Sequence, residues 1–193
     1  YKTKQEELAI FDELKEKAEW YIDVMSRMGV TTVEGKSGYG LDKETEIKQL
    51  KVMKAINEDP MRKVDIATTF LGAHAVPTEY KGREDEYIDF LIEEMMPLIQ
   101  EKGLAEHCDI FCEKGVFTVE QSRRLLQAAK ERGFGVKIHA DEIVSFGGAE
   151  LAGELQALSA DHLLHASDAG IQAMANNHVV ATLLPLTAFT LRE

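Results

Sequence analysis

Short runs of β-branched and apolar residues alternate with segments of helical periodicity along the chain, and this alternation restricts the possible folds more than any other feature. Strands separated by helices are joined by right-handed crossovers, so they are expected to lie parallel in one sheet. The sequence therefore predicts an α/β fold with about six parallel strands. The expected strands are 30–33, 64–71, 108–112, 134–139, 160–163 and 178–183.

Helix signals separate these runs, because apolar residues recur at helical spacing and capping residues stand at the ends. Asp42 is suited to be an N-cap, and Thr118 with Gln121 forms a capping box. The expected helices cover 6–28, 43–57, 84–102 with a kink at Pro97, 119–132, 149–158 and 168–176.

Two arrangements fit this alternation, a doubly wound sheet and a (β/α)8 barrel. Polar, chemically capable residues recur after successive strands, as in barrel enzymes, whereas open sheets usually concentrate theirs at one switch point. The barrel is therefore preferred. A complete barrel needs about 250 residues and eight strands. With 193 residues, the chain is predicted to form an incomplete (β/α)8 TIM-type barrel.

The composition narrows the classes of partner. The formal net charge is −12 with scattered basic residues, so phosphate backbones and anionic lipid are repelled. Neither nucleic acid nor membrane is therefore an expected partner.

Cys108 and Cys112 lie on one predicted strand, too close to each other to form a disulfide easily. With no signal peptide and no long apolar run, reduced thiols and a cytoplasmic location are expected. The expected partner is a small-molecule substrate, and a homo-oligomer is left open.

The segment 136–142 is the richest in chemistry, because it contains a lysine and a histidine and ends in two acidic residues. Strand side chains alternate, so His139 faces the opposite way from Ile138 and Ala140. In a barrel His139 would point inward at the mouth, where a neutral imidazole can ligate Zn²⁺ or Fe²⁺. A hydrogen-bonded structural histidine is the alternative. Glu142 can handle a proton of a bound water or of the substrate.

A second histidine, His162, follows the next predicted strand and is expected beside His139. Two histidines on adjacent strand ends are a more specific signal than either alone. Asp161 can orient an imidazole or cap the loop, and His165 is expected to be structural. Glu113 stands at a suitable strand end but has no identifiable partner.

The loops after the first two strands carry further polar side chains. His74 lies in a tight Gly-Ala-His-Ala-Val-Pro loop and is expected to face a pocket, with a surface histidine as the alternative. Tyr39 stands in Ser37–Gly40, where two glycines allow close backbone approach and the tyrosine ring can stack and hydrogen-bond. This turn lacks the GxGxxG and GxxxxGK[ST] patterns of phosphate-binding loops.

Five motifs occur in order along the chain: GVTTVEGKSGYGLD, TTFLGAHAVP, CDIFCEKGVF, KIHADE and SADHLLHAS. Together they resemble the imidazolonepropionases over nearly the whole chain. The resemblance implies a metal-dependent barrel of the amidohydrolase superfamily. It also implies a hydrolase that opens the ring of 4-imidazolone-5-propionate to N-formimidoyl-glutamate in histidine degradation, with Zn or Fe as cofactor.

Carried over by motif, the resemblance makes His139 a metal ligand and places His162 beside the metal-bound water. It assigns substrate contact or proton handling to Tyr39, His74 and Glu142. The superfamily opens its barrel with a His-x-His pair and closes it with an aspartate, and neither is found here. Residues 1–193 are therefore expected to be the central part of the barrel, with its first and last strands and the remaining ligands outside this chain.

Three other interpretations stay open. One is another amidohydrolase, such as a nucleobase deaminase or a cyclic amidase, and a substrate panel would separate it. A second is a catalytically inactive scaffold fragment, which metal content and turnover would reveal. The third is a lyase or aldolase, because Lys36 and Lys137 are expected at inward strand positions and could form Schiff bases.

Overall fold

The structure is a computed structural model that describes residues 4–192. Six parallel strands lie in sequential order in one sheet. They are β1 (Thr32–Lys36), β2 (Asp65–Ala73), β3 (His107–Cys112), β4 (Gly135–Ala140), β5 (Ser159–His162) and β6 (Val180–Thr182). The α-helices are α1 (Lys4–Arg27), α2 (Lys43–Asn57), α3 (Glu84–Phe90), α4 (Met96–Glu101), α5 (Val119–Glu131), α6 (Gly148–Glu154), α7 (Asp168–Asn176) and α8 (Pro185–Leu191).

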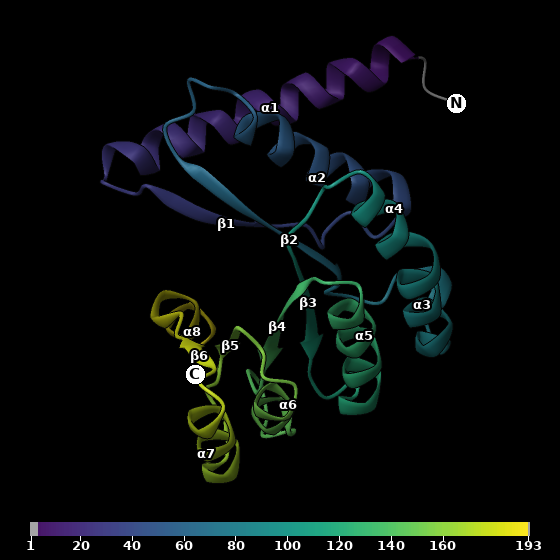
Figure 1. The fold of residues 1–193 in the computed structure, drawn as a ribbon, viewed down its shortest axis with the longest axis vertical. Coiled ribbons are helices and arrows are strands. Elements are labelled where there is room, and N and C mark those ends of the chain that lie inside the picture. Colours follow the sequence, from purple (N-terminus) through teal and green to yellow (C-terminus); the bar gives the residue numbers. More distant parts are fainter. Residues whose placement is uncertain (1–3, 193) are drawn as a thin grey trace.

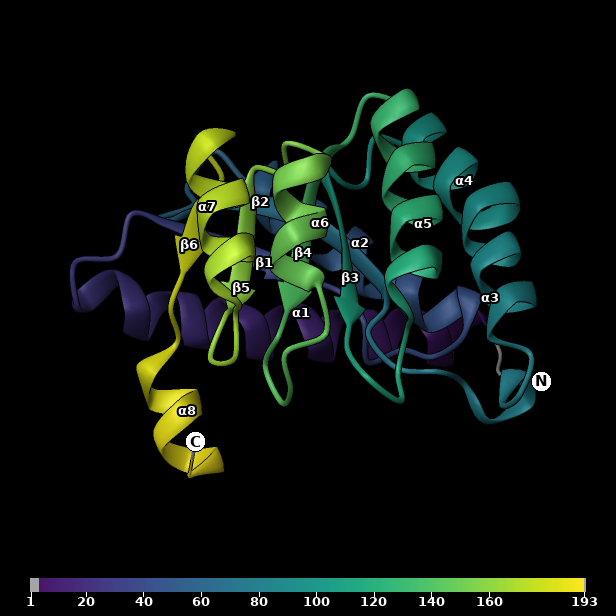
Figure 2. The same ribbon diagram turned by 90° about the horizontal axis from the view of Figure 1, so that it is seen from below.

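The sheet curls into an arc, with helices α1 to α7 on its convex side and its concave side open (Figure 1). Strands β1 and β6 form its two edges, and each has one strand neighbour among the described residues. Helix α8 extends beyond the end of β6 (Figure 2). A doubly wound sheet would carry helices on both faces, so this one-sided cover confirms the predicted incomplete (β/α)8 barrel.

Strand alternation separates the core from the concave side. Cys108, Ile110 and Ile138 are completely buried in the main hydrophobic core, between the sheet and the helices. Asp109 and His139 alternate with them and therefore face the concave side. Both cysteines are free, as predicted, and both are buried. Burial raises the pKa of the Cys112 thiol to about 11. They are core residues, because a buried protonated thiol is a poor nucleophile.

Helix ends follow the predicted caps. Asp42 accepts a hydrogen bond from the Thr45 amide at the start of α2. The capping box of Thr118 and Gln121 is present at the start of α5.

None of the helices in residues 4–192 is long and apolar enough to cross a membrane.

Several predicted boundaries were wrong for identifiable reasons. Strand β1 begins at Thr32, because the Val30 amide bonds to the Met25 carbonyl in the exit from α1. The expected helix 84–102 contains a π-helical turn at Leu91–Met95. Pro97 follows this turn and lacks the N–H of a regular helix, which accounts for an irregularity here. Helix α8 was not predicted.

Helix α6 also ends earlier than the expected 158, at Glu154. Gln156 adopts a left-handed conformation with φ 52°. The Leu158 amide then donates to the Val136 carbonyl, at the approach to β5. Pairing with β4 therefore overrides the helical periodicity of these residues.

Candidate metal and hydrolase site

One row of strand positions crosses the concave side at the carboxyl ends of three strands. Phe111 on β3 is in register with His139 on β4, and His139 is in register with Asp161 on β5. The neighbour of His139 in register is therefore Asp161 and not His162. His162 is opposite Ala140.

His162 nevertheless reaches the site. Its backbone is left-handed, with φ 75°, and so is that of Leu163, with φ 60°. This departure from extended backbone breaks the strand alternation, and the His162 ring centroid lies 5.3 Å from that of His139. The predicted proximity of the two histidines is confirmed, although by a different geometry.

Aromatic rings continue from His139 along the rim. The His74 ring centroid lies 5.9 Å from that of His139, and the Tyr39 ring centroid lies 4.6 Å from that of His74. Phe111 stacks on His74 at 5.7 Å with an interplanar angle of 18°. The structure therefore brings Tyr39, His74, His139 and His162 together on one rim, as expected for a barrel.

Tyr39 and His74, on the same rim as His139, differ in exposure. Tyr39 is 78% exposed, so its phenol is available to a ligand. His74 is partly buried, and burial together with the nearby His139 lowers its pKa. A neutral imidazole at this position can both donate and accept a hydrogen bond.

Glu142 and His162 form a close pair at the mouth. Glu142 Oε1 lies 3.3 Å from His162 Nδ1, and both side chains are about nine-tenths buried. Burial lowers the pKa of His162, despite the opposing effect of the Glu142 charge. The pair combines an acid–base carboxylate with an imidazole that is neutral near pH 7.

The loop that carries Glu142 is fixed from both sides. Asp141 is completely buried, and its carboxylate accepts hydrogen bonds from four backbone amides, those of residues 146–149. Glu113, left without a partner in the sequence analysis, is also buried and accepts from the Ile143 amide at 2.9 Å. Glu142 therefore stands between two anchored residues, which restricts its position.

The glycine turn around Tyr39 binds an anion from within the chain. The Gly38 and Gly40 amides donate to Glu46 Oε1 at 3.0 and 2.7 Å, and Glu46 is 2% exposed. Gly38 has φ +125°, and a Cβ on Gly40 would lie 2.8 Å from Glu46 Oε1. This carboxylate occupies the amides that a phosphate would need, so the turn serves to hold Tyr39.

The Glu46 carboxylate should therefore contribute to stability. We expect Glu46→Ala to lower the free energy of unfolding by roughly 1–3 kcal/mol, because buried amides lose their acceptor. Glu44→Ala on the same helix is a matched control, since Glu44 is exposed, and its effect should stay within about 0.5 kcal/mol. Urea unfolding measures both, and equal effects would show that the turn does not depend on Glu46.

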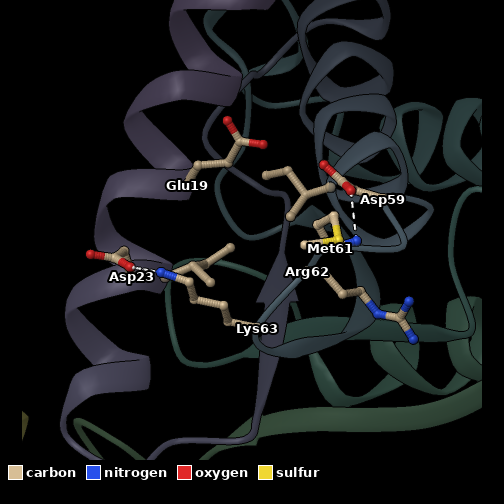
Figure 3. Close-up of a pocket in the computed structure, with 8 residues that line it drawn as sticks. Glu19, Asp23, Asp59, Met61, Arg62 and Lys63 are labelled. Carbon is tan, nitrogen blue, oxygen red and sulfur yellow. Dashed lines mark hydrogen bonds and ion pairs between the residues drawn. The ribbon is translucent and has the colours of Figure 1, made fainter.

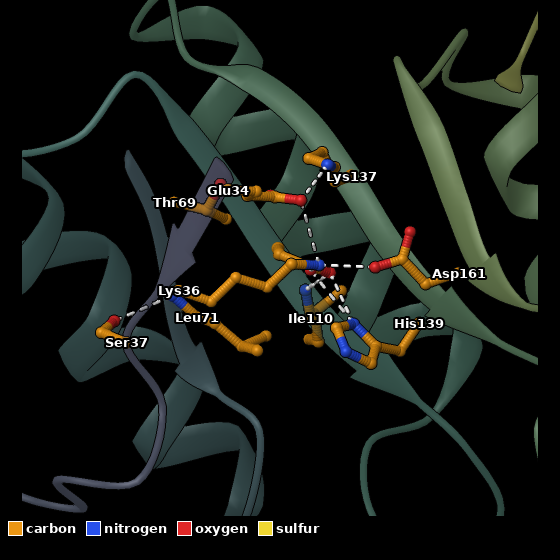
Figure 4. A network of polar contacts seen from close by, with 10 residues as sticks. Glu34, Lys36, Ser37, Thr69, Leu71, Ile110, Lys137, His139 and Asp161 are labelled. Carbon is orange, nitrogen blue, oxygen red and sulfur yellow. Dashed lines mark hydrogen bonds and ion pairs between the residues drawn. The ribbon is translucent and has the colours of Figure 1, made fainter. Parts of the chain in front are cut away.

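A polar network lies beneath the rim. Lys36 extends from β1 across the concave side toward Asp161, with His139 close by (Figure 4). Lys36 Nζ donates to Asp109 Oδ2 at 2.8 Å and to Asp161 Oδ2 at 2.5 Å. Asp109 Oδ1 in turn lies 3.1 Å from His139 Nδ1. Asp109 is completely buried, so these contacts replace its hydration.

The charges in this network hold one another ionised. Burial alone would lower the pKa of Lys36, but the charges of Asp109 and Asp161 outweigh it and raise that pKa. Burial alone would raise the pKa of Asp109, but His139 and Lys36 hold it well below its usual range. For His139, the effect of burial is likewise outweighed by Asp109, and its pKa is raised.

These contacts argue against the Schiff-base interpretation. A nucleophilic lysine must be an uncharged amine, whereas Lys36 is held protonated between two carboxylates. Lys137 does face inward, but its ammonium lies 2.5 Å from Glu34 Oε2. Glu34 also accepts a hydrogen bond from Thr69. Both lysines are thus partners of carboxylates.

The donors present fit a divalent cation. Asp109, His139 and Asp161 each offer one ligand atom, and these atoms lie within 4.8 Å of one another. Lys36 already supplies a positive charge between the two carboxylates. His139 Nδ1 faces Asp109, which leaves Nε2 as its second donor. Asp161 Oδ1 is buried without a hydrogen-bond partner among the described residues. Buried polar atoms usually have a partner, and a bound cation would supply one here.

Several residues that build this site were not predicted from the sequence, namely Glu34, Glu46, Asp109 and Asp141. Asp109 had a detectable signal: it is the charged residue within the apolar run 108–112, which a buried strand excludes unless the charge is paired. Its partner Lys36 lies 73 residues away, so the pairing itself required the fold.

A separate hollow lies away from this rim. Residues of α1 and of the 59–63 loop surround a volume of about 260 Å³, with Lys63 paired to Asp23 across it (Figure 3). The loop precedes Asp65, the first residue of β2. The hollow is therefore at the amino ends of the strands, the face that barrel enzymes use for stability and not for chemistry.

Comparison with solved structures supports the fold. An Arabidopsis ADAL protein complexed with IMP matches with a TM-score of 0.71 and 9% identity, over 92% of this chain and 53% of that one. A Xaa-Pro dipeptidase with bound methionine matches with a TM-score of 0.58 and 19% identity, over 86% and 44%. At such identities the likeness concerns the fold alone. No family model matches the chain.

Curated relatives are far more similar in sequence. The imidazolonepropionase of Phocaeicola vulgatus is 78% identical over 185 residues, and that of Bacteroides thetaiotaomicron is 72% identical over 183. The Clostridium tetani imidazolonepropionase is 62% identical over 182 residues. These alignments cover 94–96% of this chain but 43–45% of the relatives, so the chain spans less than half of their length. Across that span, the chain is similar to the imidazolonepropionases at 62–78% identity.

Proposed function

We propose that the chain is the central part of a metal-dependent hydrolase that opens the ring of 4-imidazolone-5-propionate to N-formimidoyl-glutamate. The observation that carries this proposal is that His139, Glu142 and His162 lie close together at the mouth of the barrel. They do so in a sequence that is 58–78% identical to imidazolonepropionases. The first and last strands of the barrel would come from chain outside these residues.

His139 would hold the metal, Zn or Fe, through Nε2. Asp161, which is in register with His139, has an oxygen, Oδ1, that no other group hydrogen-bonds among the described residues. The other ligands would lie outside this chain. Nitrogen and oxygen donors suit either metal. A bound divalent metal supplies an acidified water near neutral pH.

The Glu142–His162 pair would handle protons during hydrolysis. Glu142 Oε1 can take a proton from an attacking water and return it to the ring nitrogen that leaves, while His162 Nδ1 holds the carboxylate in place at 3.3 Å. Tyr39 and His74 would contact the small-molecule substrate from the neighbouring loops, because both lie on the same rim.

A chimera tests this function. The chain replaces the matching segment of the Phocaeicola vulgatus relative, to which it is 78% identical. Imidazolone propionate, a hydantoin and a pyrimidine nucleobase are then offered in parallel. We expect hydrolysis of the imidazolone alone. Preferential turnover of the hydantoin or nucleobase would instead indicate a cyclic amidase or a deaminase, and a folded, metal-loaded chimera without turnover would indicate a scaffold.

The chain by itself should behave differently from the chimera. We expect weak metal binding and no ring opening, because zinc sites use at least three protein ligands. Asp109 is already bonded to Lys36 and to His139 Nδ1, which leaves His139 Nε2 and Asp161 Oδ1 as the available donors of the cluster. The exposed edges of β1 and β6 also offer unpaired backbone groups to a second copy. Metal content after dialysis, turnover and sedimentation check this. A monomer with stoichiometric metal and full turnover would contradict it.

A further inference from the structure

Among the described residues, one side chain, that of Asp109, forms a hydrogen bond with the His139 ring. It lies on β3, one inward position below Phe111, and it is completely buried. His139 is on the neighbouring strand and is 9% exposed. The contact thus joins two adjacent strands below the rim, away from bulk water, where a charge-assisted hydrogen bond is strong.

Two contacts of the Asp109 carboxylate are with groups that can only donate. Oδ2 accepts from the Lys36 ammonium at 2.8 Å, and Oδ1 accepts from the Ile110 amide at 2.7 Å. Such surroundings stabilise the ionised carboxylate, which has no proton of its own to give. The remaining contact, 3.1 Å from His139 Nδ1, therefore requires the proton to be on Nδ1.

From this geometry we propose that Asp109, held by Lys36, is a positioning residue that fixes the ring and the tautomer of His139. With Nδ1–H directed at Asp109, a neutral His139 presents an unprotonated Nε2. Such an outer carboxylate both orients an imidazole and raises its basicity. The inference deepens the proposed function, because it concerns the histidine that would hold the metal.

Lys36 has a defined part in this arrangement. Its ammonium lies between Asp109 and Asp161 and offsets part of their combined negative charge. Without Lys36, two buried carboxylates would face each other, and one would be favoured to take a proton. A protonated Asp109 could itself donate, so the direction of its hydrogen bond with His139 would no longer be fixed.

The test is the tautomer of His139 in the metal-free chain. Long-range ¹H–¹⁵N correlation distinguishes Nδ1–H from Nε2–H, recorded about 2 pH units above the ordinary histidine pKa of 6.5. The signal is assigned by its loss in His139→Gln. We expect the Nδ1–H tautomer in the unmodified chain and in Asp109→Asn, which keeps an acceptor oxygen. Asp109→Leu should lose this preference.

Two further variants separate positioning from folding. Asp109→Leu leaves the Lys36 ammonium paired with Asp161 alone. The double variant with Lys36→Met removes the charges of Asp109 and Lys36 together and leaves Asp161 as a lone carboxylate that can take up a proton. This double variant should fold and still lose the Nδ1–H preference. Glu154→Gln is the control: it disrupts an ion pair with Arg123 between helices on the convex side, and the tautomer should persist.

A second measurement uses the metal. In the chimera, the double variant should bind Zn²⁺ about 10- to 100-fold more weakly in competition with a chelator. An Nε2–H tautomer in the unmodified chain, or an unchanged tautomer in the folded double variant, would overturn the inference. The tautomer is read without metal or substrate. A correct tautomer in a chimera that lacks ring-opening activity would therefore reject the proposed function alone.

Discussion

Replacing His139 with alanine in the chimera is expected to remove metal and activity together. His139 would supply a direct ligand atom, so metal affinity should fall by more than the roughly 10- to 100-fold typical of an outer partner. Turnover of imidazolone propionate should fall to background. Metal analysis after gel filtration and a turnover assay measure the two losses on one sample.

Glu142→Gln separates metal binding from chemistry in the same protein. It should keep the metal but lose turnover by about 10²- to 10⁴-fold, because the amide cannot take a proton. His178→Asn is the control, since His178 is exposed near the amino end of β6 and should be silent. Equal loss of metal from the His139 and Glu142 variants would show that the two roles are wrongly divided.

Replacing Asp141 with alanine is expected to have the largest effect on stability. Four backbone amides at the start of α6 would lose their acceptor. We expect the free energy of unfolding to fall by roughly 3–5 kcal/mol, in the range of the severest single substitutions.

Asp42→Ala is the matched comparison for Asp141. Asp42 also caps a helix, but it is exposed and accepts from one backbone amide, that of Thr45. Its loss should cost about 1 kcal/mol. Urea unfolding of both variants compares them directly. Similar losses would mean that the buried cap does not fix the loop that carries Glu142.

Local signals were sufficient to predict much of the fold. The capping residues Asp42 and Thr118 and the apolar run 108–112 each indicate one element from neighbouring residues alone, and the structure confirms all three. Alternation along β4 correctly predicted that His139 faces inward, because a regular strand repeats every two residues.

Predictions failed where distant contacts decide the conformation. The backbone of His162 is left-handed, with φ 75°, and no local pattern indicates this for a histidine. Glu46 fills the turn that contains Tyr39 from the following helix. Asp109 is paired with Lys36 from β1 and His139 from β4. These residues are neighbours only after the sheet has curled, so spacing along the chain could not reveal them.

His139 is proposed to bind a metal through Nε2 at the mouth of the incomplete barrel. Anomalous diffraction from crystals of the chimera, recorded at the absorption edge of the bound metal, tests it most directly. We expect one peak about 2.0–2.1 Å from His139 Nε2, with Nδ1 still hydrogen-bonded to Asp109. A peak at Nδ1 between Asp109 and Asp161, or a metal site that does not include His139, would contradict it.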